Sequence, residues 1–429
     1  MALDAFGRLR TSDCFTTFNY YPSAMTDNTT LDIDVWVPGA TGGAQSYNSF
    51  NYINMPISGP GVTYSYRTTK QPMIYQPGKS RLIFMTGVLM TTVPPSSGTA
   101  FSHMGIFTLD NASPPAVTQG TYLLTDGINL FWEDKLQNVT PSTSAVQSSW
   151  NIDTFNGNGP SGKTLTIANA AENLLIVIDQ EWLGVGRIRC GFVIDGVIYY
   201  AHQFLHNNMT YQYTNTPRLN LSYYIVGNSA NSMRQMCSTN IIEGGYFTTG
   251  RVNTALNNIN NFVTLSTTNQ NVILAIKINS SFPFSTFFLK SVSLYNTGGS
   301  TRYAEYTIQL HSTNGNIGAL ANSTPPPNPP PYTPSFSALN NSSIEYYIGN
   351  GTVYVTPTLL LPLGYKPGII IGSGFVDSSS NINISLSEFD SLQTHQLFTK
   401  YDTLIITGQA SSGGSTSSMG AAVTFIEDI

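Results

Sequence analysis

One stretch of this sequence matches a phosphate-binding pattern. Residues 157–164 read GNGPSGKT, which fits the expression GxxxxGK[ST]. In that motif the amides at the start of a helix hold the phosphates, so a buried strand must precede the loop and a helix must follow it. Residues 148–155, SSWNIDTF, are polar and irregular, and residues 164–167, TLTI, alternate as a strand. We therefore interpret the motif as a turn and expect no nucleotide site.

Two histidines could bind a metal ion. His202 and His206 are four residues apart and would share one face of a helix. The residues before and around His202, YYAHQF, have instead the aromatic character of a strand. We expect both histidines to be ordinary polar positions.

Other catalytic patterns are weak in this chain. The three cysteines form no CxxC pair and no histidine-flanked spacing, and no GxSxG elbow is present. The members of a triad converge only in space, so the sequence alone does not test for one. We expect no enzyme activity, catalytic residue, metal ion or cofactor.

A carboxylate beside a tryptophan could bind sugar. Glu181 precedes Trp182, and an aromatic ring next to an acid can hold a saccharide by stacking and hydrogen bonding. Trp182 is followed by LGVG, which is also typical of a core anchor before a turn. A glycan contact at Glu181 and Trp182 and a purely structural role are both open at this stage.

The composition limits the function classes. The chain has 429 residues, of which 10% are charged, against about 25% in an ordinary soluble domain. Its net charge of −5 and the absence of a basic run disfavour nucleic acid and anionic membranes as partners. The first ten residues, MALDAFGRLR, contain three charges and do not resemble a secretory signal. No apolar run approaches the roughly 20 residues that span a bilayer.

Short strand patterns, separated by Gly, Asn, Asp and Pro, run through almost the whole chain. The clearest is a hairpin, because Asp195-Gly196 separates two apolar runs and favours a type I′ turn. We predict an all-β protein with a docking arm at 1–30, a jelly-roll-like β-sandwich at 31–250 and a second, smaller β-sandwich at 251–429. The second sandwich contains a proline-rich exposed loop at 321–335.

Several segments of the first 250 residues resemble those of one protein family. They are residues 4–12 (DAFGRLRTS), the aromatic stretch at 15–21, residues 153–162, 178–187 and 190–196, and the pair His202 and His206 with Asn207. These segments are similar to structural proteins of tailed phages and large DNA viruses. The resemblance implies a concanavalin-like or jelly-roll sandwich in a virion, at a capsid, vertex, tail or fibre position.

These observations lead to two functional hypotheses. The first is a non-enzymatic virion structural protein, such as a minor capsid, vertex or tail-associated component, made in the host cytoplasm without a secretory signal. It would form a symmetric homo-oligomer and contact neighbouring virion proteins through its sandwiches and arm. The candidate arm anchors are Phe6, Arg8, Arg10, Phe15, Phe18 and Tyr20; packing of the arm on its own domain is the alternative. The second hypothesis is a glycan- or receptor-binding, lectin-like fibre module.

Overall fold

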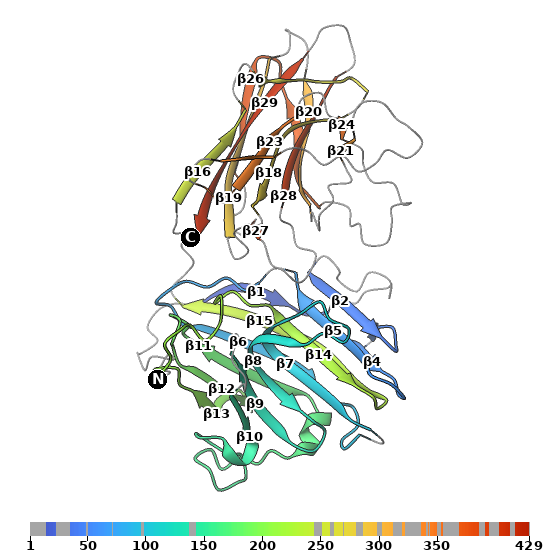
Figure 1. The fold of residues 1–429 in the computed structure, drawn as a ribbon, viewed down its shortest axis with the longest axis vertical. Coiled ribbons are helices and arrows are strands. Elements are labelled where there is room, and N and C mark those ends of the chain that lie inside the picture. The colour runs from blue at the N-terminus through green and yellow to red at the C-terminus, as the bar shows by residue number, and fades with distance from the viewer. Residues whose placement is uncertain are drawn as a thin grey trace. The chain divides into compact units, whose positions relative to one another are not determined.

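The chain forms two units, Met1–Tyr246 and Phe247–Ile429, and both are built almost entirely of β-strands in the computed structural model (Figure 1). The structure describes residues 14–22, 35–48, 50–70, 72–95, 98–136, 143–243, 251–257, 261–268, 270–279, 286–297, 303–311, 320–321, 336–339, 342, 344–349, 353–354, 369–385, 391–393, 403–411 and 417–428. None of the helices in these ranges is long and apolar enough to cross a membrane.

The first unit is a sandwich of two antiparallel sheets. The β6 sheet has the order β13 (Val197–Phe204), β12 (Ile188–Ile194), β11 (Leu174–Gln180), β6 (Arg81–Val88), β15 (Asn231–Glu243), β4 (Tyr52–Ile57) and β3 (Ser46–Asn48). The β7 sheet has the order β10 (Thr143–Val146), β9 (Leu130–Lys135), β8 (Val117–Thr125), β7 (Ala100–Leu109), β14 (Leu221–Gly227), β5 (Thr63–Thr69) and β2 (Trp36–Thr41). Two short 3₁₀ helices, η1 (Gln147–Ser149) and η2 (Ile167–Ala171), join β10 to β11.

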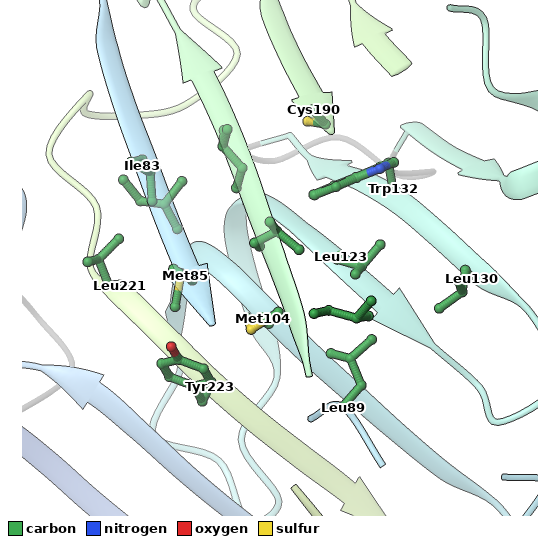
Figure 2. Close-up of a cluster of buried hydrophobic side chains, with 14 of the residues drawn as sticks. Ile83, Met85, Leu89, Met104, Leu123, Leu130, Trp132, Cys190, Leu221 and Tyr223 are labelled. Carbon is green, nitrogen blue, oxygen red and sulfur yellow. The ribbon is translucent and has the colours of Figure 1, made fainter. Parts of the chain in front are cut away.

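Alternating burial along these strands makes the first core. Every second residue of β4 and β9 is buried, as expected for strands with one covered face. Side chains of the two sheets meet between the layers: Met85 comes from the β6 sheet, and Met104 and Trp132 come from the β7 sheet (Figure 2). Burying each such side chain stabilises the fold by about 1.5–3 kcal/mol relative to exposure.

The residues expected to form the end of a docking arm are a strand of this sandwich. Strand β1 (Cys14–Tyr20) pairs antiparallel with β15, beside the stretch of β15 that lies next to β6. Phe18 and Tyr20 place their rings edge-on against the buried Trp36, with ring centroids 6.2 and 5.1 Å away. The described part of the expected arm thus packs on its own domain, which is the alternative left open above.

Two local expectations have opposite outcomes. The hairpin is confirmed: β12 and β13 are joined by Asp195 and Gly196, whose φ angles of 53° and 77° fit a type I′ turn. The sequence pattern at residues 47–53 predicts one strand, but this prediction is wrong, because β3 and β4 are two strands joined by a tight turn. Asn51 has a φ of 60° there, and its amide donates to the Asn48 carbonyl.

The second unit is also a two-sheet sandwich. Its β19 sheet has the order β16 (Arg251–Leu256), β29 (Ser418–Asp428), β19 (Thr286–Asn296) and β26 (Ser380–Ser385), with β17 (Val263–Thr264) on β29 and β27 (Ser391–Gln393) on β19. Its β18 sheet has the order β21 (Leu320–Ala321), β24 (Val353–Tyr354), β18 (Gln270–Ile278), β28 (Thr403–Ala410), β20 (Ala304–His311) and β25 (Ile369–Val376), with β23 (Ile344–Ile348) on β18 and β22 (Ser337–Ala338) on β23.

The core of the second unit is mostly aliphatic, with Tyr306 and Phe425 as its buried aromatic residues. Buried side chains such as Ile276, Val292 and Ile406 fill the space between its two sheets. The predicted class, an all-β chain with two successive sandwiches, is therefore confirmed. The proline-rich loop expected at 321–335 lies outside the described residues, apart from the backbone of Ala321.

Candidate functional site

The outer face of the β7 sheet carries a row of aromatic side chains. Strand register places Tyr66 opposite Tyr224, and Tyr224 opposite His103. The row continues with Leu124 and Phe131 on β8 and β9. Residues opposite one another in antiparallel strands share a face. This row alternates with core residues such as Met104, so it points away from the sandwich interior.

Part of this face is a compact second layer that we call the outer aromatic cluster: His103, Phe107, Tyr122 and Tyr224. The rings of Phe107, Tyr122 and Tyr224 surround His103 at centroid distances of 5.2–6.3 Å. The three rings are almost fully buried, although they lie outside the core between the sheets. They converge over Gly105, which pairs with Tyr122 and has no side chain to keep them apart.

Burial sets the charge state of this cluster. Burial lowers the pKa of His103 to about 4, although a hydrogen bond with the Tyr224 backbone acts in the opposite direction. The Tyr122 hydroxyl donates to Glu133 Oε1 at 2.8 Å, and burial raises the pKa of that phenol, with the Glu133 charge adding to the effect. His103 and Tyr122 are therefore neutral at pH 7, and the cluster forms an uncharged support for the residues around it.

Next to this support lies a partly exposed surface, which we call the aromatic face. Its members are half-buried or exposed apolar and aromatic side chains on β5, β7, β8, β9 and β14: Tyr64, Tyr66, Phe101, Leu124, Phe131 and Val226. Phe101 is 40% exposed. The rings of Tyr64 and Tyr66 are parallel to within 9°, with centroids 6.1 Å apart.

A glycine positions the tyrosine at the end of the aromatic face. Gly39 of β2 pairs with Tyr66, and a Cβ atom on Gly39 would lie 2.2 Å from Tyr66 Cζ. The ring of Tyr66 therefore lies against the bare backbone of β2. Burial, with a smaller contribution from Tyr64, raises the pKa of Tyr66 to about 12, so its hydroxyl remains a neutral donor and acceptor.

The chemistry of this face suits an amphipathic ligand. Its rings offer flat apolar area, and its phenols and the Glu133 carboxylate offer hydrogen bonds beside that area. Binding sites for organic ligands combine apolar and aromatic lining with a few polar groups in this way. Sequence patterns placed Tyr64 and Tyr66 in a strand, but the sequence contains no signal that shows which face each residue occupies.

A second group of polar side chains lies inside the first unit. His206 Nε2 is 2.8 Å from Asp134 Oδ2, and its Nδ1 is 2.6 Å from the Gly186 carbonyl oxygen. The Thr121 hydroxyl donates to Asp134 Oδ1 at 2.7 Å, and the imidazole stacks on Tyr213 at 4.0 Å. His206 and Asp134 are both buried, so this pair joins the β9 strand to the loop after β13. It is a structural link and has no open side for a substrate.

The residues suggested for a glycan contact belong to the interior of the same unit. Glu181 is fully buried. Trp182 is half-buried, packs edge-on against Tyr75 at 6.0 Å and donates from Nε1 to the Thr214 hydroxyl. This placement matches the structural alternative for Trp182, because neither side chain presents its polar group to a ligand from solution.

The structure describes three of the six residues proposed as arm anchors. Phe6, Arg8 and Arg10 lie outside the described residues. Phe15, Phe18 and Tyr20 lie on β1, and Tyr20 is part of the core.

The loop that matches the phosphate-binding pattern is occupied by the protein's own carboxylate. Asp153 Oδ1 accepts from the Phe155 amide and Oδ2 accepts from the Ser161 amide, both at 2.8 Å. Burial acts to raise the pKa of Asp153, but these hydrogen bonds outweigh it and lower that pKa. Lys163 pairs with Asp195 of the neighbouring hairpin. Thr164, at the end of the loop, forms an isolated β-bridge with Asn156, and the helix that follows is a short 3₁₀ helix. The interpretation of the motif as a turn therefore holds.

His202 and His206 do not converge. His202 Nδ1 accepts from the Asn151 amide, whereas His206 pairs with Asp134. Burial lowers the pKa of His202 to about 4. Among the described residues, no group of three or more His, Cys, Asp or Glu side chains could hold a metal ion.

Comparisons with known proteins yield structural similarity alone. No family model matches the chain, and no curated protein matches its sequence. Arcelin-5, a lectin-like defence protein from Phaseolus vulgaris, aligns with 54% of this chain and 98% of its own at 9% identity and a TM-score of 0.31. An endo-1,3-β-glucanase from Streptomyces sioyaensis aligns with 54% and 97% at 8% identity and a TM-score of 0.37. A carbohydrate esterase from the Shiga toxin-encoding bacteriophage phi24B aligns with 54% and 100% at 11% identity and a TM-score of 0.30.

Proposed function

We propose that this chain is a non-enzymatic glycan-binding protein and that its ligand lies on the aromatic face of the first unit. The observation that carries this proposal is the row of half-buried rings on the outer face of the β7 sheet, with the rings of Tyr64 and Tyr66 parallel and Val226 between Tyr64 and Phe101. A sugar has apolar C–H faces and peripheral hydroxyls, so it matches flat rings with neutral phenols at their edges.

The charges of the chain favour a carbohydrate over a polyanion. The sequence has 18 basic and 23 acidic residues. Nucleic acid binding depends on neutralising phosphates with basic side chains. A neutral or weakly polar oligosaccharide needs only stacking and hydrogen bonds.

The non-enzymatic part of the proposal rests on how the interior acids and bases are used. The buried Asp134 pairs with His206, and the buried Asp179 pairs with Arg189. Glycoside hydrolysis commonly uses two carboxyl groups on either side of a bond that is open to substrate. These carboxylates instead hold strands and loops together, and Glu133 is the single carboxylate assigned to the ligand face.

The test is binding of the full-length chain to an array of immobilised oligosaccharides, followed by titration calorimetry with the strongest binder. Tyr66→Ala removes a ring from the aromatic face and should weaken binding by at least about tenfold, since an aromatic anchor contributes on the order of 1.4 kcal/mol or more. Tyr52→Ala is the matched control, because Tyr52 is a half-buried tyrosine on the other sheet.

Two results would contradict glycan binding at this face. One is a wild-type chain that retains no oligosaccharide from the array. The other is an equal loss of affinity in Tyr52→Ala and Tyr66→Ala, which would place the ligand elsewhere.

We also propose that the chain is a structural component of a virion, which is compatible with glycan binding by a particle surface. The low charge content and the N-terminal segment at residues 4–12 support this role. Proteomic analysis of purified particles should find the chain at a fixed ratio to the major particle proteins. Its presence in infected cells but not in particles would refute the virion role without affecting glycan binding.

A further inference from the structure

Strand β25 is the outermost described strand of the β18 sheet. Strand β25 pairs with β20 on one side, and no described strand pairs with its other side. Its sequence, IIIGSGFV, contains no charge and no proline. Ile308 of β20 pairs with Gly372 and Gln309 pairs with Ile370, so β25 has a bulge at Ile371 and is regular from Gly372 onward. The carbonyl of Val376 accepts from Asn296 Nδ2, so Gly372–Phe375 is the stretch of interest at the edge. A long uncharged edge is a template for pairing with another strand.

Apolar side chains flank this edge. Ile370 is 58% exposed and Phe375 is 61% exposed. Tyr303, which is 49% exposed, places its ring edge-on against Phe375 at 5.2 Å. These three residues add exposed apolar area beside unpaired backbone groups, which is the combination expected at an association site.

Two glycines flatten the same strand on its inner side. A Cβ atom on Gly372 would lie 3.3 Å from Ile308 Cδ1, and one on Gly374 would lie 2.9 Å from Tyr306 Oη. The side chains of β20 therefore cover the glycine positions of β25. Because β25 contributes little bulk there, a further strand can extend the sheet without meeting large side chains.

The first unit protects its edges by several means. Strands β3 and β10 are three and four residues long, and β2 contains Pro38. The longer edge strand β13 is covered: Asn151 Oδ1 accepts from the Gln203 amide and its Nδ2 donates to the Gln203 carbonyl. The amides of Ile152 and Asp153 donate to the Ala201 carbonyl. No comparable cover is found for residues 370–375 in the described part of the second unit.

We propose that β25 is a self-association edge, where the strand pairs antiparallel with β25 of a second copy of this chain. A two-fold axis relates two identical strands in antiparallel order and makes one continuous sheet from two β18 sheets. An uncharged strand suits its own copy, because no like charges oppose each other across the contact. The pairing covers Phe375 and satisfies the free backbone groups of both strands.

The test is analytical ultracentrifugation of the full-length chain over a range of concentrations. The wild type should sediment as a dimer, and Phe375→Lys, which brings two cations to the contact, should raise the dimer dissociation constant by at least about tenfold. Val252→Lys is the matched control, because Val252 is 57% exposed on β16, an edge strand of the other sheet of the same unit.

Hydrogen exchange locates the contact independently of the variants. Amides of Gly372–Phe375 on the outer side should become protected as the protein concentration rises, whereas those of β16 should not change. If Phe375→Lys does not fold, Ser373→Lys introduces the same charge at an exposed position. A wild type that stays monomeric would overturn the proposal. So would a dimer that Val252→Lys weakens as much as Phe375→Lys does.

Discussion

Both units are two-sheet sandwiches, but they expose different parts of their sheets. The first unit shortens, interrupts or covers its edges, and the outer face of its β7 sheet carries exposed aromatic rings. In the second unit, no described strand pairs with the outer side of β25, and exposed apolar side chains lie beside that strand. A face can bind a compact ligand through side chains, whereas an edge binds another strand through its backbone. The two proposals therefore concern different kinds of contact, one in each unit.

We expect the largest effect from acid, which should destabilise the first unit through its buried histidines. His103 and His202, whose pKa values are lowered by burial, both lie in the first unit. Each is neutral in the fold at pH values above about 4, whereas the unfolded chain takes up a proton below about 6.5. The stabilisation from a neutral buried histidine is complete above pH 6.5 and is lost as the pH falls toward 4. For His103 the loss is up to about 3 kcal/mol.

His103→Phe keeps an aromatic ring but removes the titration. Urea unfolding followed by circular dichroism at pH 7 and pH 4.5 should show a smaller acid effect on the variant than on the wild type. If acid lowers the stability of the wild type and of the variant equally, His103 is not the cause of the acid sensitivity of the first unit.

Adding a methyl group to Gly39 of β2 tests whether the position of the Tyr66 ring, and with it ligand binding at the aromatic face, depends on that edge strand. In Gly39→Ala the new Cβ would overlap the Tyr66 ring, so the ring must move away. Overpacking of this kind costs about 1–3 kcal/mol of stability. Oligosaccharide affinity should fall toward that of Tyr66→Ala, while the sedimentation of the β25 dimer should not change. Ala40→Ser, one residue farther along β2, is the control and should leave both properties unchanged.

The smallest expected effect on stability comes from a substitution that uncovers an edge strand of the first unit. That unit would then resemble the second unit in having an edge available for pairing. Asn151→Ala removes both side-chain hydrogen bonds to Gln203, which should cost about 1 kcal/mol and uncover part of β13. Self-association of the Phe375→Lys background should then increase in ultracentrifugation. Asn151→Asp keeps the acceptor and loses the donor, so an intermediate result is expected. Unchanged sedimentation would show that Asn151 is not what keeps β13 from pairing.

Local patterns predicted the strands well where turn chemistry was explicit. The Asp195-Gly196 turn fixed the β12–β13 hairpin, because few residue pairs adopt two positive φ angles. The β3–β4 turn was missed, because Tyr47, Phe50 and Tyr52 read as one continuous strand. β1 was assigned to an arm, since a register shift between Thr16 and Phe18 disrupts its alternation.

The candidate site was harder to predict than the fold. The aromatic face joins Tyr66, Phe101 and Phe131, which are far apart in sequence and meet only through the strand order β9-β8-β7-β14-β5. Glu181 and Trp182 are adjacent in sequence and drew attention for that reason, but Glu181 is buried. Residues that are adjacent in sequence are easy to notice together, whereas a sheet surface is assembled across strands that the sequence does not order.

The buried Trp36 that anchors β1 also has a spectroscopic consequence. All four tryptophans of the chain, Trp36, Trp132, Trp150 and Trp182, lie in the first unit. Selectively excited indole emission therefore reports the melting of that unit only, while the second unit contributes to circular dichroism without contributing to the indole signal. Recording both signals during one denaturation resolves whether the halves melt together or in sequence, without dyes, labels or truncation.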